Sequence, residues 1–483
     1  MQLFEIILTI TSSLILVFGQ HIIKKNGLNY VLGSLLITLV THLVIDGYRW
    51  QMLPSYFLWL LAFISAVRPR TKSHNTILRI LKAIVILLIL ILSFLLPSLL
   101  PVFDLPKPRG IYNVGTTLFH VKTERDEIIT NDTSDKRELL YKIWYPSEAD
   151  VSSMRSEKYV DRGSRAGFAM KYGLPPAAMN YLDYIKTHVY EDIPIANGSF
   201  PLLIFSHGYG SKATGYYSLL SELASQGYII INMNHTYESL GTTFPDGRIV
   251  HFDYNFQKEI SSGGMEVMMP LIEAFKNNID YDERHPIVRK AVKEFYESES
   301  VDRWAEDITT TIDLANDWNN QGFLANKLRL DQLAVFGHSN GGGAAGMVSA
   351  KDDRVKAGVN IDGITWGNLI DTFYNVPFLY ISADWPAEHE DINSHIYINK
   401  STDHFYECKL INSGHPSFMD IPFMIPIPSI AGTGSIDPYL GMEITTNLLT
   451  SFFDKHLKKL SNANPNKIDE EYELLEMTVH VRD

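Results

Sequence analysis

The chain has almost no cysteine, since Cys408 is the single one among its 483 residues. One thiol cannot form an internal disulfide, and it cannot build a metal cluster held by cysteines alone. The sequence also lacks the glycine-rich fingerprints that cradle a nucleotide phosphate or a dinucleotide. These absences exclude a disulfide-stabilised scaffold and give no support to an enzyme that uses ATP or a nicotinamide cofactor.

Charge is scarce at the front of the chain. Residues 1–104 carry eight cations and three anions, a net charge of +5, whereas the whole chain has a net charge of −13. The remaining residues therefore carry −18, so a basic, apolar front is joined to an acidic body. This division argues against a purely soluble enzyme, against a disordered protein, and against a protein whose body binds nucleic acid.

Long hydrophobic runs fill the front. Ala83–Phe103 has 21 residues without a charge, and a helix needs about 20 apolar residues to cross the hydrocarbon of a bilayer. Three weaker runs precede it, at Leu3–Phe18, Leu28–Ile45 and Leu53–Val67. The first run is not typical of a cleaved signal peptide, because its leading residues contain an acid and no lysine or arginine. We expect an uncleaved multi-pass membrane module of about four helices over residues 1–104.

Cations in the short loops predict the orientation of this module. Two loops carry most of them: Lys24 and Lys25 after the first run, and Arg68, Arg70, Lys72 and Arg79 after the third. Because cytoplasmic loops are enriched in lysine and arginine, four spans place both loops in the cytoplasm. The protein is then expected in the cell membrane with its N-terminus and its body outside, whereas three spans would change the side of the body.

The body has the pattern of an α/β domain. A stiff proline-containing linker is expected at residues 105–115, and a strand near a sheet edge at Leu139–Tyr145, which ends at Pro146. Six further runs have the pattern of buried strands: Leu202–Phe205, Tyr228–Met233, Leu333–Phe336, Val355–Ile361, Val376–Ile381 and Phe405–Ile411. Strands alternating with helical stretches predict a mainly parallel sheet over residues 116–460, with ligands beyond the carboxyl ends of the strands.

Two parts of the body fall outside this alternation. Residues 256–320 are helical in pattern, and the first part is longer than a sheet connection needs. We expect that part to form a cap over the site, and the amphipathic stretch Val301–Trp318 to cover the sheet. The polar residues 461–483 are expected to form a loosely attached tail.

The strongest motif follows the strand at Leu333–Phe336. Residues 337–341 read GHSNG, a G-x-S-x-G, and a glycine-rich stretch compatible with a helix comes next. A serine on a tight strand-to-helix turn needs small neighbours, and the following helix directs its N-terminal amides at developing negative charge. The pattern predicts that Ser339 is a nucleophile.

An oxyanion hole needs two backbone donors. The first expected donor is the amide of Asn340, directly after the nucleophile, and the second is the amide of Tyr209 in the loop SHGYG, where Gly208 and Gly210 permit close approach. His207 in this loop comes too early for the chain order Ser, Asp, His. We expect it to shape the loop rather than to act as the base.

The expected general base is His415, because it lies in a loop after the last strand-like run. Two aspartates are candidates for the acid that orients it. Asp362 ends VKAGVNID and Asp384 ends VPFLYISAD, so both come at the carboxyl end of a strand. Spacing alone leaves the choice between them open.

Several of these motifs together resemble one known family. FSHGYG, VFGHSNGG, NID and NSGHPSF are similar to segments of the platelet-activating factor acetylhydrolase family, plasma and type II form, and the likeness covers about residues 110–455. The resemblance implies an α/β-hydrolase fold and a calcium-independent phospholipase A2 activity. It also implies Asp362 rather than Asp384 as the acid, and hence a triad of Ser339, Asp362 and His415 with the amides of Tyr209 and Asn340 as oxyanion hole. Asn340 stands where that family usually has phenylalanine, so we expect a more polar acyl pocket.

Three functions follow as hypotheses. The first is a membrane-tethered serine ester hydrolase that removes short or oxidised acyl chains from phospholipids or related esters through an acyl-enzyme. The second is a dienelactone-hydrolase-like or general carboxylesterase acting on soluble esters, with Asp384 as a possible acid. The third is a non-catalytic binding or sensor protein with a hydrolase fold.

The serine mechanism requires no cofactor and no metal. The cluster Glu388, His389, Glu390 and Asp391 is typical of a charged loop, because no helical histidine spacing accompanies it. The expected partners are an ester or phospholipid substrate and the lipid bilayer, without nucleic acid. The sequence does not define an oligomeric state.

Overall fold

The computed structural model describes residues 1–24, 27–68, 76–211, 213–385, 392–397 and 404–481. The chain divides into two compact units. Unit 1 comprises Met1–Asp104 together with Ala177–Ile185 and Phe423–Ile430, and unit 2 comprises the remainder. Each unit is described by itself.

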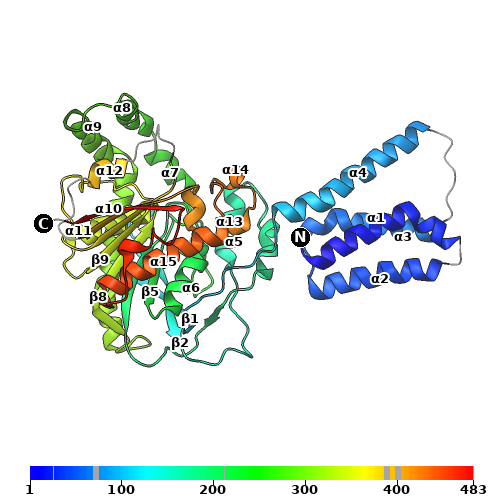
Figure 1. The fold of residues 1–483 in the computed structure, drawn as a ribbon, viewed down its shortest axis with the longest axis horizontal. Helices are drawn as coiled ribbons and strands as arrows, with labels where there is room; N and C mark the ends of the chain where they lie inside the picture. Colours follow the sequence, from blue (N-terminus) through cyan, green and yellow to red (C-terminus); the bar gives the residue numbers. More distant parts are fainter. Residues whose placement is uncertain (25–26, 69–75, 212, 386–391, 398–403, 482–483) are drawn as a thin grey trace. The chain divides into compact units, whose positions relative to one another are not determined.

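Unit 1 is built on four apolar helices (Figure 1). They are α1 (Leu3–Ile23), α2 (Leu28–Ile45), α3 (Leu53–Val67, preceded by the 3₁₀ turn η1 at Trp50–Met52) and α4 (Thr76–Leu99). All four, counting η1 with α3, are long and apolar enough to cross a membrane. The four apolar runs of the sequence are therefore helical, but α4 begins and ends earlier than expected, so Arg79 lies inside a helix and not in a loop. Lys25, Arg70 and Lys72 lie outside the described residues.

A buried ion pair ties the helices of unit 1 together. Arg49 donates from Nη2 to Glu5 Oε2 at 2.6 Å and from Nη1 to the Leu100 carbonyl at 2.7 Å. The Asp46 carboxylate accepts from the Glu5 amide at 3.0 Å. Because the Arg49 and Glu5 side chains are each only 1% exposed, this pair replaces water as the partner of both charges.

Two later segments belong to unit 1 as well. Within Ala177–Ile185, the Ala178 carbonyl accepts from Trp50 Nε1 at 2.7 Å, and Tyr184 donates to the Tyr48 carbonyl at 2.7 Å. The sequence pattern assigned this segment to the body, because nothing in its composition indicates its partners.

Unit 2 contains a ten-stranded sheet with the order β12-β11-β10-β9-β8-β4-β5-β2-β1-β3. The strands are β1 (Asn113–Asp126), β2 (Lys136–Ser147), β3 (Val189–Glu191), β4 (Phe200–Ser206), β5 (Ile229–His235), β8 (Leu328–His338), β9 (Ala357–Ile361), β10 (Phe378–Ser382), β11 (His404–Leu410) and β12 (Leu475–Val481). A separate two-stranded sheet pairs β6 (Gly241–Thr243) with β7 (Ile249–His251). The central strands from β5 to β11 are parallel, as the alternating pattern predicts.

The structure gives detail on three expectations about the margins of the body. The strand at Leu139–Tyr145 is the third from one edge of the sheet, because β2 lies between β5 and β1 and pairs antiparallel with both. The end of the chain is not a loose tail over its whole length, because β12 pairs with β11 over seven residue pairs. In the segment expected to be a stiff linker, the Arg109 amide donates to Glu222 at 2.8 Å, and β1 begins at Asn113.

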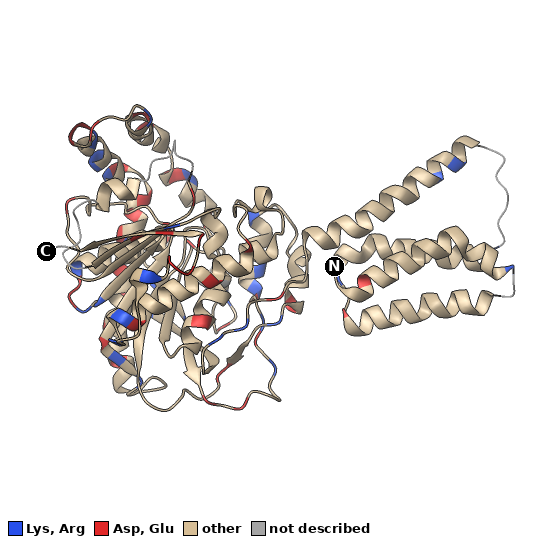
Figure 2. Ribbon diagram, viewed as in Figure 1, with Lys and Arg blue, Asp and Glu red and all other residues tan. Residues whose placement is uncertain are grey.

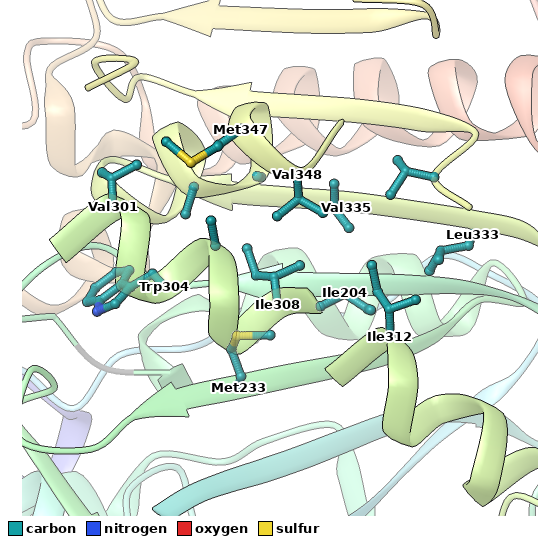
Figure 3. Close-up of a cluster of buried hydrophobic side chains, with 14 of the residues drawn as sticks. Ile204, Met233, Val301, Trp304, Ile308, Ile312, Leu333, Val335, Met347 and Val348 are labelled. Atoms are coloured by element: carbon teal, nitrogen blue, oxygen red, sulfur yellow. The ribbon is translucent and has the colours of Figure 1, made fainter. Parts of the chain in front are cut away.

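Helices cover both faces of the sheet. On one face, α10 (Glu297–Asn320) and α11 (Asn340–Lys351) bury Trp304, Ile308 and Met347 against strand residues such as Ile204 and Val335 (Figure 3). On the other face lie α6 (Tyr217–Ser225) and α15 (Pro438–His456), where the Phe453 ring meets the Phe336 ring at a centroid distance of 5.7 Å. Alternate residues of β8 therefore pack against helices on opposite faces of the sheet, which explains why the strand is a continuous apolar run.

The remaining helices connect the strands. They are α5 (Arg162–Lys171), α7 (Tyr254–Ile260), α8 (Gly264–Lys276), α9 (Tyr281–Glu294), α12 (Ile392–Tyr397), α13 (Ile421–Met424) and α14 (Pro428–Ala431). Short 3₁₀ turns are η2 (Pro176–Tyr184), η3 (Ala213–Tyr216), η4 (His415–Phe418) and η5 (Pro465–Lys467). Helices α8 and α9 pack on each other and bury Leu271 and Val292 in the core of unit 2. That α7–α9 form a cap over the site stays a prediction.

Charges follow the division that the sequence indicates. Figure 2 shows few charged residues along α1–α4 and many across the strands, helices and loops of unit 2. The parallel strands of unit 2 all end at one edge of the sheet, which brings the residues after β4, β8 and β9 together.

Candidate active site

Ser339 lies on a strained turn between β8 and α11. Its backbone has φ 57° and ψ −127°, a left-handed conformation that non-glycine residues rarely adopt. A Cβ on Gly337 would come within 2.3 Å of the Gly341 carbonyl oxygen, and one on Gly341 within 2.2 Å of the Ser206 carbonyl oxygen. Glycine is therefore required on both sides of this serine, as the G-x-S-x-G pattern predicts.

The structure brings His415 and Asp362 together. His415 begins η4 after β11, and its Nδ1 lies 2.6 Å from Oδ2 of Asp362, which follows β9. The other oxygen of Asp362 accepts from the Ala383 amide at 2.8 Å and from Trp385 Nε1 at 2.9 Å. With both oxygens occupied, the buried carboxylate can hold the imidazole in one orientation with the proton on Nδ1.

Asp384 lies elsewhere. Its carboxylate pairs with Lys409 at 3.3 Å and accepts from the Asn412 amide at 2.9 Å. Asp384 therefore supports the loop before His415 and does not bond to the imidazole. The geometry favours Asp362, the acid that the family resemblance implies.

The loop after β4 approaches the nucleophile. A Cβ on Gly208 would lie 3.1 Å from the Ser339 Cβ, so the backbone next to Tyr209 passes directly beside the serine. Asn340 is the first residue of α11, so its amide belongs to the helix N-terminus. Asn340 thus follows Ser339 directly in the chain, and Gly208, the neighbour of Tyr209, approaches the serine from the loop after β4.

His207 is fully buried below this loop. Burial lowers its pKa to about 3, so the imidazole is neutral at physiological pH. Its Nδ1 bonds to the Gly208 carbonyl oxygen at 2.8 Å. These contacts agree with a loop-shaping role for His207.

A chain of hydrogen bonds that the sequence pattern does not reveal joins the loop to His415. The Gly208 amide donates to the Tyr216 hydroxyl at 3.1 Å, and this hydroxyl donates to His338 Nδ1 at 2.9 Å. His338 Nε2 in turn donates to the His415 carbonyl at 3.1 Å. Burial holds the pKa of His338 well below its ordinary value, which keeps the ring neutral and able to accept at Nδ1. The only sequence signal for this link is the histidine inside the GHSNG motif.

Polar groups of α10 also lie near the nucleophile. Asn340 Nδ2 donates to Ser300 Oγ at 3.0 Å, and Ser300 donates to the Glu297 carbonyl. Burial raises the pKa of Glu297, and the nearby His415 opposes this shift. Trp366 Nε1 donates to the Glu297 carboxyl at 2.8 Å. These polar contacts beside the nucleophile were not evident in the sequence, except at Asn340 itself.

The expected charged loop at Glu388, His389, Glu390 and Asp391 lies outside the described residues. Within the described part of the chain, no three histidine, cysteine, aspartate or glutamate side chains gather as a candidate metal site.

Comparison with solved structures identifies the fold. A ferulic acid esterase from Streptomyces cinnamoneus matches with a TM-score of 0.61 at 21% identity, over 78% of this chain and 100% of that one. Together with the mostly parallel sheet and its strand order, this likeness shows that the chain has an α/β-hydrolase fold.

The family follows from sequence comparison. The model of the family "Platelet-activating factor acetylhydrolase, isoform II" matches residues 101–476. The platelet-activating factor acetylhydrolase of Canis lupus familiaris is 25% identical over 383 residues, covering 73% of this chain and 77% of that protein. A probable 1-alkyl-2-acetylglycerophosphocholine esterase of Arthroderma benhamiae is 23% identical over 258 residues, covering 51% and 56%. The chain belongs to the platelet-activating factor acetylhydrolase isoform II family, and it is a carboxylic ester hydrolase.

Proposed function

We propose that this protein is a membrane-tethered serine hydrolase in which Ser339, His415 and Asp362 form the catalytic triad. The observation that carries this proposal is the 2.6 Å contact between His415 and Asp362 at the sheet edge where Ser339 occupies its strained turn. Asp384, bonded to Lys409 instead, is not the acid.

The groups act in a defined order. His415 Nε2 accepts the proton of Ser339 as Oγ attacks the ester carbonyl, while Asp362 stabilises the imidazolium that forms. The amides of Tyr209 and Asn340 stabilise the negative oxygen of the tetrahedral intermediate. His415 then gives the proton to the leaving alcohol, and an acyl-Ser339 intermediate remains. Water, activated by His415, hydrolyses this ester and releases the acid.

The proposed substrate is a phospholipid, or a related ester, with a short or oxidised acyl chain. The names of the relatives in dog and in Arthroderma benhamiae both refer to an acetyl ester of a glycerophospholipid. The polar Asn340 side chain directly after Ser339, hydrogen-bonded to Ser300, supports this choice, because polar groups beside the nucleophile suit a short or oxygenated acyl group better than a long alkyl chain.

The proposed location is the membrane. Four helices of unit 1 have the length and composition of membrane spans. Lys24 and Arg68 lie at the ends of α1 and α3, so the positive-inside tendency places these ends in the cytoplasm and the hydrolase outside.

The test is a panel of esters with the full-length protein in detergent micelles. We expect hydrolysis of a phospholipid with an acetyl chain and of p-nitrophenyl acetate, and little hydrolysis of a long-chain phospholipid. Ser339→Ala should abolish all of it, whereas the control Ser349→Ala, on the same helix, should keep it. Hydrolysis of p-nitrophenyl acetate with inert phospholipids would favour a soluble-ester hydrolase, and equal activity of Ser339→Ala would exclude the triad.

A further inference from the structure

The hydrogen-bond partners of His207 define its tautomer. The backbone amide of His235 donates to His207 Nε2 at 3.2 Å, so Nε2 carries no proton. The proton therefore lies on Nδ1, which donates to the Gly208 carbonyl at 2.8 Å. Because the side chain is fully buried, water does not compete for either bond.

The bond to the Gly208 carbonyl has a consequence for the next amide. The carbonyl of Gly208 and the N–H of Tyr209 belong to one planar trans peptide unit, in which C=O and N–H point in opposite directions. The His207 Nδ1–H holds this carbonyl toward the interior, and it therefore directs the Tyr209 N–H away from the interior. The Gly208 amide is also held, by Tyr216 at 3.1 Å, so this glycine is restrained on both sides.

The group that sets the tautomer is itself immobilised by a buried network. His235 bonds from Nδ1 to Asp307 at 2.8 Å and from Nε2 to Ser206 at 2.8 Å. Arg137 donates to Asp307 at 2.7 Å, and the His235 ring stacks on Trp304 with a centroid distance of 3.8 Å. The Ser206, His235 and Asp307 side chains repeat the bonding order of a catalytic triad, but all three are fully buried and cannot meet a substrate. Such a network can serve only to position its neighbours.

We propose that His207 is a positioning residue that orients the Gly208–Tyr209 peptide, so that the Tyr209 N–H faces the oxyanion formed at Ser339. This inference rests on the proposed function, because it takes Tyr209 as an oxyanion donor. In this arrangement His207 transfers no proton. Its contribution is to prevent the peptide from rotating and presenting a carbonyl oxygen to the developing negative charge.

Two polar variants separate positioning from packing. In His207→Asn the side-chain nitrogen is the same number of bonds from Cα as Nδ1, so it can still donate to the Gly208 carbonyl. In His207→Gln the nitrogen is as far from Cα as Nε2, and this donor is misplaced. His456→Gln is the matched control, because His456 is a buried histidine at the end of α15 that bonds to the Tyr406 hydroxyl on β11 at 3.0 Å.

The measurement is kcat and KM for p-nitrophenyl acetate, normalised to the fraction of protein that a fluorophosphonate probe labels to completion at Ser339. His207→Gln should lower kcat by about 10²–10³-fold, the usual effect of losing one oxyanion donor, with little change in KM. His207→Asn should recover most of this loss, and His456→Gln should resemble the native protein. The pH midpoint of kcat/KM should be the same in all of them, since His415 remains the base.

Equal losses in His207→Asn and His207→Gln, or a shifted pH midpoint, would overturn the positioning role. A loss of kcat in His456→Gln as large as in His207→Gln would overturn it as well. Failure of the proposed function has a different signature, because the native protein would then show no hydrolysis or labelling that depends on Ser339.

Discussion

Asp362 and Asp384 follow neighbouring parallel strands, yet only Asp362 bonds to His415. The difference lies in the partners that each carboxylate already has. Asp362 receives an amide and an indole donor on one oxygen and presents the other to the imidazole, whereas Asp384 is neutralised by Lys409. The assignment of the acid therefore depends on hydrogen bonds that no spacing rule contains.

Substituting the two aspartates tests this assignment. Asp362→Asn removes the negative charge and favours the wrong tautomer of His415, so kcat should fall by about 10⁴-fold. Asp384→Asn should change kcat little, because Asp384 contacts Lys409 and the Asn412 amide. Steady-state hydrolysis of p-nitrophenyl acetate measures both, and a larger loss in Asp384→Asn would reverse the assignment.

Three buried histidines near the site predict how stability depends on pH. Burial lowers the pKa of His207 to about 3 and also lowers those of His235 and His338. Unfolded histidine has a pKa of about 6.5, so below that pH the unfolded chain binds protons that the folded chain does not. The stability that these three neutral rings contribute is fully present above about pH 6.5 and is lost as the pH falls, for His207 by up to about 1.4 kcal/mol per pH unit down to its pKa of about 3.

Urea unfolding at pH 7.5, 6.5 and 5.5 measures this dependence. The midpoint should fall between pH 6.5 and 5.5, and His207→Gln should show a shallower fall because one titrating group is gone. A midpoint independent of pH over this range would contradict the predicted burial of the three rings.

The sequence predicts the reacting groups of the proposed site better than it predicts the hydrogen bonds that hold them in place. Ser339, His415 and the loop of Tyr209 could be found from local motifs, because strained turns and close approach demand glycine at fixed offsets. The supporting links could not be found in this way. Arg137 and Asp307 are 170 residues apart in the chain, and only the fold brings them together.

At the scale of helices and strands, the apolar runs of the sequence locate most of the elements. They do not show which strands lie next to one another in the sheet. The pattern of β2 indicates a strand near a sheet edge, but it does not reveal that β1 and β3 lie beyond it. The strand β12 was missed although its residues alternate between apolar and polar, because it lies in a segment that is polar and charged overall and at the margin of the sheet, where burial is weak. The hydrophobic pattern of a segment indicates how far its residues are buried. The order of strands depends on pairing between residues far apart in the chain, which the pattern of one segment does not contain.

The ion pair of Glu5 and Arg49 yields a prediction for the helices of unit 1. Arg49→Gln leaves a buried carboxylate without its partner, which typically costs about 3–5 kcal/mol. Glu5→Gln combined with Arg49→Gln should recover part of this loss, since no unpaired charge remains. Thermal unfolding in detergent measures both. The exposed pair of Lys136 and Asp126 provides the control, because Lys136→Gln should have little effect. Similar melting of Arg49→Gln and the native protein would contradict the burial of the pair.

At the scale of the whole molecule, the uneven charge predicts which side of the membrane each unit occupies. The front has few charges and a net positive balance, whereas the hydrolase carries −18. With four spans and cation-bearing ends in the cytoplasm, the hydrolase is outside. This prediction depends on the number of spans being even, because three spans instead of four would place the hydrolase in the cytoplasm.

Cysteine labelling of the full chain in intact cells tests the predicted topology. The native Cys408 is buried, so it should react little. In Ser152→Cys, on an exposed loop of the hydrolase, a membrane-impermeant maleimide should label the protein from outside. In Lys24→Cys labelling should require permeabilised cells. The reverse pattern would place the hydrolase in the cytoplasm.

In the proposed mechanism, Ser339 forms the covalent intermediate of an ester hydrolase. Fluorophosphonate labelling of the full-length protein, followed by peptide mass spectrometry, tests this role of Ser339. We expect one adduct, on Ser339, and a loss of ester hydrolysis in proportion to the fraction of protein labelled, with neither adduct nor hydrolysis in Ser339→Ala. An adduct on another residue, or a Ser339→Ala protein that hydrolyses esters at the native rate, would contradict it.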